Sequence, residues 1–319
     1  MKLRDLAYYR TGGRCRALYE PKTIEDLSRI VQALHVTQQK YFVLGGGTNS
    51  LVLDEDWTGA VIVFRRMNHV EVRGTSLYVE AGADNTDVAK AALDAKLDGI
   101  AWMNRLPGQI GGTVRMNARC YGGEISQVAK EVHAVLPDGT IRVYTAADGI
   151  FRGYKDTIFM DNGAIVAAAL LQLVEGVRGS IESRMNFYEQ DRVKKGQFHY
   201  PTCGCVFKND YTVGIPSGML LDKAGAHKLS RPEVALNPQH ANFVYNKGAG
   251  SRDILELTLA MRELVYKEFG VWMEYEMEIL GELPADLAKK ISEKKPHRLR
   301  EDRLQPIRAL FQKKNTPES

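Results

Sequence analysis

Apolar side chains recur at helical spacing in three stretches of the chain, residues 23–36, 84–97 and 251–269. In each stretch most apolar positions are three or four residues apart, which places them on one face of a helix. Thr23 and Ser251 stand at two of the starts, where a side-chain oxygen can cap free N–H groups. We therefore predict helices here, and a shorter helix that begins at residue 217.

Shorter apolar and β-branched runs between these helices predict strands. The runs cover residues 41–44, 60–64, 69–73, 76–80, 132–136, 140–145, 164–173, 242–245 and 271–280. Asp138 and Gly139 separate two of the runs and suit the tight turn of a hairpin. Because helices and strands follow one another irregularly, we predict an α+β fold and not a repeated βαβ pattern.

Composition narrows the class of protein. The 319 residues are 44% hydrophobic and 26% charged, as in ordinary globular proteins, and suffice for two or three domains. The sequence shows no run of 18 apolar residues and no signal-peptide core, and its four cysteines are too few for a disulfide framework. We therefore expect a cytoplasmic protein.

The formal net charge of +4 is concentrated at one end of the chain. Residues 283–319 carry ten Lys and Arg against five Asp and Glu, whereas residues 1–282 carry 33 against 34. A nearly neutral body favours neither nucleic acid nor a membrane surface as a partner. The basic segment is interpreted either as a solvated terminal extension or helix, or as a tail that docks an unidentified protein partner.

Two glycine-rich loops are candidates for phosphate binding, because glycine lets backbone N–H groups approach an anion. The first contains Gly45, Gly46, Gly47, Thr48, Asn49 and Ser50, and the second contains Pro107, Gly108, Gly111, Gly112 and, shortly after it, Asn117. The first matches neither the dinucleotide fingerprint nor the P-loop, and each loop alone could be a plain turn. Together, about 60 residues apart, they predict a grip on the pyrophosphate of one dinucleotide.

Cys203 and Cys205 form a Cys-X-Cys pair that could be half of a metal site. The other two cysteines, Cys15 and Cys120, are far away in the sequence and no cluster of histidines and cysteines accompanies the pair. We therefore do not expect a metal. The pair is interpreted either as buried and inert, or as containing a thiol that donates a proton.

Three carboxylates, Glu274, Glu276 and Glu278, alternate with apolar residues in the predicted strand 271–280. Strand periodicity places them on one face, and such a face is usually exposed to solvent. Three neighbouring carboxylates also repel one another, so a partner cation or a raised pKa is expected for one of them. The pattern itself does not choose which one.

In this order, these motifs resemble the UDP-N-acetylenolpyruvoylglucosamine reductases (the MurB family), flavoenzymes that make UDP-N-acetylmuramate for peptidoglycan. The resemblance runs from about residue 9 to residue 282. It is carried by residues 10–13, 44–52, 107–122, 154–159, 200–209, 217–225, 240–243 and 269–281. Residues 164–200 leave little room for an additional insertion, so the chain resembles the shorter subtype of the family.

The resemblance implies a fold of the vanillyl-alcohol-oxidase type, in which two subdomains hold FAD and a third binds the nucleotide sugar. Residues 1–68 and 69–178 would be the FAD-binding subdomains. Residues 179–282 would be an α+β substrate-binding domain, and residues 283–319 a basic extension. Both glycine loops would then surround the FAD pyrophosphate.

The implied reaction has two halves. NADPH would reduce FAD, and the reduced flavin would pass hydride to the β-carbon of UDP-N-acetylglucosamine enolpyruvate, giving UDP-N-acetylmuramate for cell-wall synthesis, cell shape and division. Two alternatives stay open at this point: a related FAD oxidoreductase with a shifted substrate, and a non-catalytic nucleotide-binding homologue with a docking tail.

Position by position, the resemblance implies roles for individual residues. Glu276 matches the catalytic glutamate, Cys205 stands where a serine usually protonates the enolate, and Lys155 stands where an arginine usually faces the substrate carboxylate. Substrate-binding positions are matched by Tyr154, Lys195 and Asn209. A thiol is a competent proton donor, but a lysine cannot reproduce the bidentate grip of an arginine on a carboxylate. Arg119 stands where a small residue is common.

Overall fold

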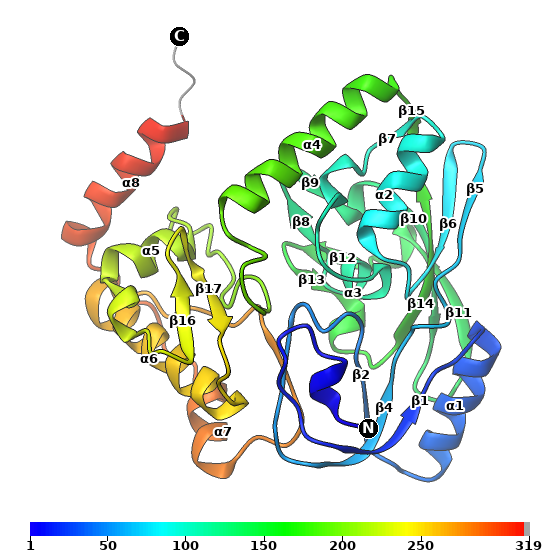
Figure 1. Ribbon diagram of the computed structural model, residues 1–319, viewed down its shortest axis with the longest axis horizontal. Coiled ribbons are helices and arrows are strands. Elements are labelled where there is room, and N and C mark those ends of the chain that lie inside the picture. Colours follow the sequence, from blue (N-terminus) through cyan, green and yellow to red (C-terminus); the bar gives the residue numbers. More distant parts are fainter. Residues whose placement is uncertain (316–319) are drawn as a thin grey trace. The chain divides into compact units, whose positions relative to one another are not determined.

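The computed structural model describes residues 1–315, which form two compact units (Figure 1). Unit 1 contains residues 14–48 and 57–194 together with Met1. Unit 2 contains residues 2–13 and 49–56 and the chain from residue 195 onward. The chain therefore passes from one unit to the other several times, and the predicted subdivision at residues 68, 178 and 282 stays a prediction.

The larger sheet of unit 1 has five antiparallel strands in the order β11-β10-β14-β6-β5. Their bounds are β5 Val70–Arg73, β6 Ser76–Glu80, β10 Ala129–Val135, β11 Ile141–Thr145 and β14 Ile165–Gln172. The central strand β14 is buried over most of its length, and the short helix α3 (Ile110–Arg115) packs against it. This packing fixes the second glycine loop, which leads into α3, to the middle of the sheet.

A smaller parallel sheet in unit 1 has the order β1-β4-β2, with β1 Cys15–Tyr19, β2 Tyr41–Val43 and β4 Trp57–Ile62. Helix α1 (Ile24–Val36) buries Leu27, Val31 and Leu34 in a core that it shares with β4. The Thr23 hydroxyl accepts a hydrogen bond of 3.2 Å from the Asp26 N–H and so caps α1 as predicted. The first glycine loop follows β2, so its start is fixed by this sheet.

The rest of unit 1 consists of two longer helices and several short elements. These are α2 Asn85–Asp94, α4 Arg178–Lys194, β7 Leu97–Asp98, β8 Arg119–Cys120, β9 Gly123–Glu124, β12 Phe151–Gly153, β13 Asp156–Thr157 and β15 Val174–Glu175. Single 3-10 turns of unit 1 lie at Ala101–Met103, Ile125–Gln127, Ala146–Asp148 and Ile158–Met160.

Unit 2 is built around the long helix α6 (Ser251–Phe269) and the hairpin of β16 (Val234–Asn237) and β17 (His240–Asn246). Helix α5 (Ser217–Ala224) packs against both α6 and β17. Strand β18 (Glu278–Leu280) pairs in parallel with β3 (Ser50–Val52), which comes from the N-terminal part of the chain. Helices α7 (Ala285–Ser292) and α8 (Glu301–Asn315) follow, and 3-10 turns lie at Leu3–Asp5 and Ala226–Leu229.

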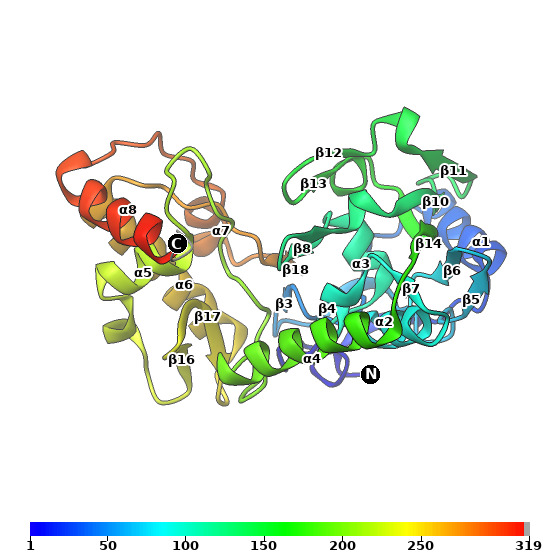
Figure 2. The same cartoon turned by 90° about the horizontal axis from the view of Figure 1, so that it is seen from above.

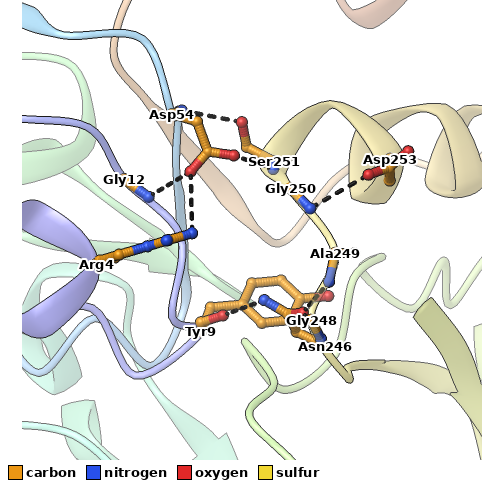
Figure 3. A network of polar contacts seen from close by, with 10 residues as sticks. All are labelled: Arg4, Tyr9, Gly12, Asp54, Asn246, Gly248, Ala249, Gly250, Ser251 and Asp253. Carbon is orange, nitrogen blue, oxygen red and sulfur yellow. Dashed lines mark hydrogen bonds and ion pairs between the residues drawn. The ribbon is translucent and has the colours of Figure 1, made fainter. Parts of the chain in front are cut away.

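Hydrogen bonds attach the N-terminal stretches of unit 2 to its main part (Figure 3). The Tyr9 hydroxyl donates to the Val244 carbonyl at 3.0 Å, and the Asn246 side-chain amide donates to the Tyr9 carbonyl at 2.8 Å. The Asp54 carboxylate accepts from the N–H groups of Gly12 (2.9 Å) and Ser251 (2.6 Å). These bonds satisfy buried polar groups, so unit 2 depends on segments separated by about two hundred residues of sequence.

The α+β class is confirmed, and so are most of the predicted elements. Helices α1 and α6 and the strand β6 end where the sequence predicts, and the predicted hairpin is β10–β11. Ser251 is not the cap of α6, however: Gly250 precedes the helix, and the Ser251 hydroxyl accepts the Asp54 N–H at 3.0 Å.

Three other predictions need correction. Only residues 278–280 of the strand predicted at 271–280 form a strand, apart from a single bridge between Phe207 and Tyr275. The last residue of the helix predicted at 84–97 belongs to β7. The basic segment contains two helices, as one interpretation held, and most of its described residues are exposed, but Leu287, Leu304 and Ile307 are at most 6% exposed and so pack against unit 2. Within residues 1–315, no helix is both long and apolar enough to span a membrane.

Candidate active site

The two glycine loops lie against each other in unit 1. A Cβ atom added to Gly46 would be 3.4 Å from the Cα of Gly108, and one added to Gly108 would be 2.9 Å from the Thr48 hydroxyl. Gly108 also has φ +130°, a conformation that other residues rarely adopt. The backbone conformation of Gly108 and its closeness to Thr48 therefore favour glycine at this position, and the contacts bring together the loops that the sequence predicts to act as one site.

Hydrogen bonds from the main chain and from side chains hold the second glycine loop in place. The Asn85 N–H donates to the Gly108 carbonyl at 3.0 Å, and the Asn85 side chain accepts from the Thr113 hydroxyl at 2.9 Å. The Gly111 N–H donates to the Ala81 carbonyl at 2.8 Å. An added Cβ at Gly112, in contrast, would have no atom within 4 Å. One side of this loop is thus fixed, while Gly112 borders open space.

The space beside the loops suits a polar ligand. The Gln109 side-chain oxygen Oε1 is buried and has no hydrogen-bond partner among residues 1–315, and it lies 3.5 Å from where a Cβ of Gly45 would stand. A buried acceptor without a donor costs free energy, so a ligand that donates a hydrogen bond there is favoured. Together with the glycine backbones, this arrangement fits a large polar cofactor held by backbone groups.

Asn117 is buried with φ +46°, and its side chain is engaged in the protein. Its amide donates to Glu124 Oε1 at 2.6 Å and to the Gly153 carbonyl at 2.8 Å, and its oxygen accepts the Ser126 N–H at 3.3 Å. A cavity of about 310 Å³ is lined by Asn117 and these three neighbours, among others. Asn117, which the sequence predicts to bind the cofactor, is therefore part of the lining of this cavity.

Lys155 is 8% exposed and has φ +52°, in the turn between β12 and β13 next to the half-buried Tyr154. Burial raises the pKa of the Cys120 thiol, and the positive charges of Arg192 and Lys155 partly oppose this increase. Arg192, at the end of α4, donates to the Trp102 carbonyl at 3.0 Å and to the Cys120 sulfur at 3.2 Å. The sequence did not indicate this buried arginine, because it stands in a basic stretch with the exposed Lys194.

Unit 2 brings Cys205 and Glu276 together. Cys205 forms a bridge with Phe243 of β17, and the next residue, Val206, accepts the Glu276 N–H at 2.8 Å. Burial, the Cys205 thiol and the Glu276 carboxylate all raise the pKa of the Cys203 thiol. Cys203 is therefore buried and protonated, and Cys205 and Glu276, both half-buried, lie close to it.

Asn49 supports the backbone of Glu276 from within unit 2. Its side-chain amide donates to the Glu276 carbonyl at 3.0 Å, and its own carbonyl accepts the Glu278 N–H at 2.9 Å. Ser50 begins β3 and pairs with Glu278 of β18. Residues 45–50, which the sequence predicts to form one loop, are therefore divided between the two units. Residues 45–48 belong to unit 1, whereas Asn49 and Ser50 belong to unit 2.

Asn209 and Lys195 are also parts of unit 2. The Asn209 side-chain oxygen accepts the Ser217 N–H at 2.9 Å, at the first residue of α5. The Lys195 carbonyl accepts from the Asn237 side chain at 2.7 Å, and the charge of Lys195 adds to burial in lowering the pKa of His240.

Glu274, another of the three carboxylates in the predicted strand 271–280, is exposed, and its carboxylate lies 3.9 Å from the Lys208 ammonium.

Comparison with known proteins decides the family. An FAD binding domain model matches residues 15–145, and a model of the UDP-N-acetylenolpyruvoylglucosamine reductase C-terminal domain matches residues 196–280. The UDP-N-acetylenolpyruvoylglucosamine reductase of Enterococcus faecalis is 34% identical over 281 residues, which is 88% of this chain and 93% of that protein. The chain belongs to the UDP-N-acetylenolpyruvoylglucosamine reductase family.

Further relatives agree with this assignment to the UDP-N-acetylenolpyruvoylglucosamine reductases. The reductase of Carboxydothermus hydrogenoformans is 32% identical over 276 residues, 86% of this chain and 90% of its own length. The crystal structure of the reductase from Thermus caldophilus has a TM-score of 0.73 at 31% identity, covering 88% of this chain and 97% of that one. The glycine loops lie within the FAD binding domain match, and Cys205 and Glu276 lie within the C-terminal domain match.

Proposed function

We propose that this protein reduces UDP-N-acetylglucosamine enolpyruvate to UDP-N-acetylmuramate, with FAD as its cofactor and NADPH as the reductant, in the synthesis of peptidoglycan precursors. The family membership carries this proposal, because the matches include both the glycine loops and the Cys205–Glu276 pair. We place the reaction in the cytoplasm.

The cofactor would be held mainly by backbone groups. Gly45, Gly46, Gly47, Thr48, Pro107, Gly108, Gly111 and Gly112 would surround the FAD pyrophosphate, and the buried Gln109 oxygen would accept a hydrogen bond from a hydroxyl group of the cofactor. FAD, when bound, supplies the chemistry of hydride transfer from NADPH to the substrate. The protein residues bind and orient the reactants, and they donate the proton.

Cys205 would complete the reduction as a general acid. Addition of hydride to the β-carbon of the enolpyruvyl group leaves an electron pair at the α-carbon, next to the carboxylate. The Cys205 thiol donates its proton there, its S–H bond breaks as a C–H bond forms, and solvent later returns the proton. Glu276 would act beside Cys205 in this half of the reaction, and the bonds of its backbone to Val206 and Asn49 fix the residue that carries the carboxyl group.

Basic and polar groups would bind the rest of the substrate. Lys155 offers one ammonium group to the substrate carboxylate, a point charge that cannot form two parallel hydrogen bonds. Lys195 would bind the diphosphate, and Tyr154 and Asn209 would complete the substrate contacts. Asn209 is held by its bond to the start of α5.

An NADPH oxidation assay on the purified protein tests the proposal. We expect bound flavin in the absorbance spectrum and NADPH consumption that depends on UDP-N-acetylglucosamine enolpyruvate. Flavin reduction without any response to the sugar nucleotide would favour a related oxidoreductase with a shifted substrate. A preparation that neither contains nor takes up flavin would favour a non-catalytic homologue.

A further inference from the structure

The basic C-terminal segment is docked onto unit 2 by both apolar and polar contacts. Residues 285–308, which we call the C-terminal strap, contribute Leu287, Leu304 and Ile307 to the core of the unit. Figures 1 and 2 show its helices α7 and α8, in orange and red, beside α6. The strap lies beyond residue 280, where the match to the C-terminal domain of the family ends.

The strap is hydrogen-bonded to the segment that leads to Glu276. The Glu293 carbonyl accepts the indole N–H of Trp272 at 3.1 Å, and His297 Nδ1 accepts the Trp272 backbone N–H at 3.3 Å. The Arg298 N–H donates to the Gly270 carbonyl at 2.7 Å. A Cβ atom at Gly270 would be 1.7 Å from the Arg298 carbonyl oxygen, so the strap passes directly over this glycine.

Arg262 of α6 connects the strap to Tyr275, the residue before Glu276. Its buried guanidinium donates to the carbonyls of Lys290 and Ile291, at the end of α7. It lies 4.2 Å from the ring centre of Trp272 and 4.8 Å from that of Tyr275. The Lys295 ammonium lies 4.4 Å from the Trp272 ring. Cation–π contacts and hydrogen bonds therefore form a continuous path from the strap to Tyr275.

The strap also holds the loop that follows Asn209. His297 Nε2 lies 3.0 Å from the Asp210 carboxylate, and Arg308 Nε donates to the Val213 carbonyl at 2.8 Å. His297 thus contacts both Trp272 and Asp210. Two of the candidate substrate-side residues of unit 2, Glu276 and Asn209, are thus each preceded or followed by a segment that the strap fixes.

We propose that the C-terminal strap is a positioning element of the active site, and that Arg262 is its central positioning residue for Glu276. Residues 271–277 form no strand in the described structure beyond the single bridge of Tyr275, so contacts from outside the segment fix it. A displacement of about 1 Å in a catalytic group can cost roughly a hundredfold in rate. The inference rests on the proposed function, because Glu276 acts in the second half of the reaction.

The test compares Arg262→Lys with the matched control Asp286→Asn in the flavin-containing protein. Lysine keeps the charge of Arg262 but loses the planar group that reaches two carbonyls and two rings. Asp286→Asn removes the ion pair between Asp286 of α7 and Arg252 of α6. This ion pair is exposed and involves neither Trp272 nor the loop after Asn209. Rapid mixing measures flavin reduction by NADPH and flavin reoxidation by the sugar nucleotide separately, and hydrogen–deuterium exchange measures the mobility of residues 271–277.

For Arg262→Lys we expect faster amide exchange in residues 271–277 and roughly tenfold or greater slowing of reoxidation, while flavin reduction stays within about twofold of the wild type. Asp286→Asn should leave amide exchange, flavin reoxidation and flavin reduction unchanged. The inference is overturned if exchange and reoxidation match the wild type, if exchange changes without any effect on reoxidation, or if both half-reactions slow equally.

One further result separates this inference from its premise. If the wild type itself is not reoxidised by the sugar nucleotide, the proposed function fails, whatever the exchange data show. A chain that ends at residue 282 also loses Leu287, Leu304 and Ile307 from its core, so the point variants carry the test whether or not that chain folds.

Discussion

The glycine loops of unit 1 and the Cys205–Glu276 region of unit 2 are built in opposite ways. The first is formed largely by glycines, and a single methyl group added at Gly108 would come too close to the Thr48 hydroxyl of the other loop. The second is a site of present side chains, held by bonds such as that from Asn49 to the Glu276 carbonyl. We therefore expect a substitution that enlarges a side chain to impair the site in unit 1, and a substitution that removes side-chain atoms to impair the site in unit 2.

The largest effect is expected from Cys205→Ala, which removes the proposed proton donor. Flavin reoxidation by the sugar nucleotide should slow by roughly 10²- to 10⁴-fold, the range typical of a lost general acid, while reduction by NADPH stays normal. Cys205→Ser replaces the thiol by a hydroxyl, which can also donate a proton, and should retain much of the turnover. Stopped-flow absorbance of the flavin checks both variants, and equal reoxidation rates of Cys205→Ala and the wild type would refute the assignment.

An intermediate effect is expected from adding one methyl group to unit 1. Gly108→Ala places a Cβ 2.9 Å from the Thr48 hydroxyl at φ +130°, and such strain costs about 1–3 kcal/mol. FAD affinity, measured by titration of the flavin-free protein, should fall about tenfold or more. Gly74→Ala is the control, because Gly74 also has positive φ (+60°) but an added Cβ there would have no atom within 4 Å. Similar losses of affinity in both variants would mean that backbone strain, and not loop contact, is responsible.

The smallest effect concerns the pH dependence of stability in unit 2. Burial, together with the charge of Lys195, lowers the pKa of His240 below its ordinary value of about 6.5. The unfolded chain therefore binds a proton at a pH where the folded chain does not, so the free energy of unfolding should fall as pH drops below about 6.5.

Urea unfolding at pH 7.5 and 5.5 measures this dependence. His240→Gln should lose less stability than the wild type between the two pH values. His35→Gln changes an exposed histidine of α1 and should behave like the wild type. The same pH dependence in all three proteins would contradict a lowered pKa of His240.

The regular elements were predictable because their signals are local. Helix α1 has both a cap and an apolar stripe, and α6 combines an apolar face with a terminal glycine, Gly270, at φ +71°. Helix α4 has no continuous apolar face in the sequence. Its buried residues are Ile181, Met185 and Arg192, and an arginine in a sequence is normally interpreted as exposed to solvent. A buried arginine is evident only once Trp102 and Cys120 are seen beside it.

The region around residue 275 shows where periodicity misleads. Glutamates alternate with apolar residues in the sequence, and this alternation predicted a strand; in the structure Met273 and Met277 are indeed buried and Glu274 is exposed. The burial instead arises in an irregular segment held by a side chain of α6 and by backbone and side-chain groups of the C-terminal strap. The three glutamates could not be told apart by pattern. The choice of Glu276 came from the family resemblance, and its bonds to Val206 and Asn49 show how its backbone is fixed.

The composition of unit 2 from three separate stretches has a consequence for the order of events during biosynthesis. Tyr9 is bonded to Val244, 235 residues later, and Asn49 to Glu276, 227 residues later. At about 5–20 residues per second, the ribosome needs roughly 10–50 seconds to deliver the partners of these residues. Strand β3 therefore waits as an unpaired edge until β18 emerges, which makes the nascent chain a natural client for chaperones that shield exposed strands.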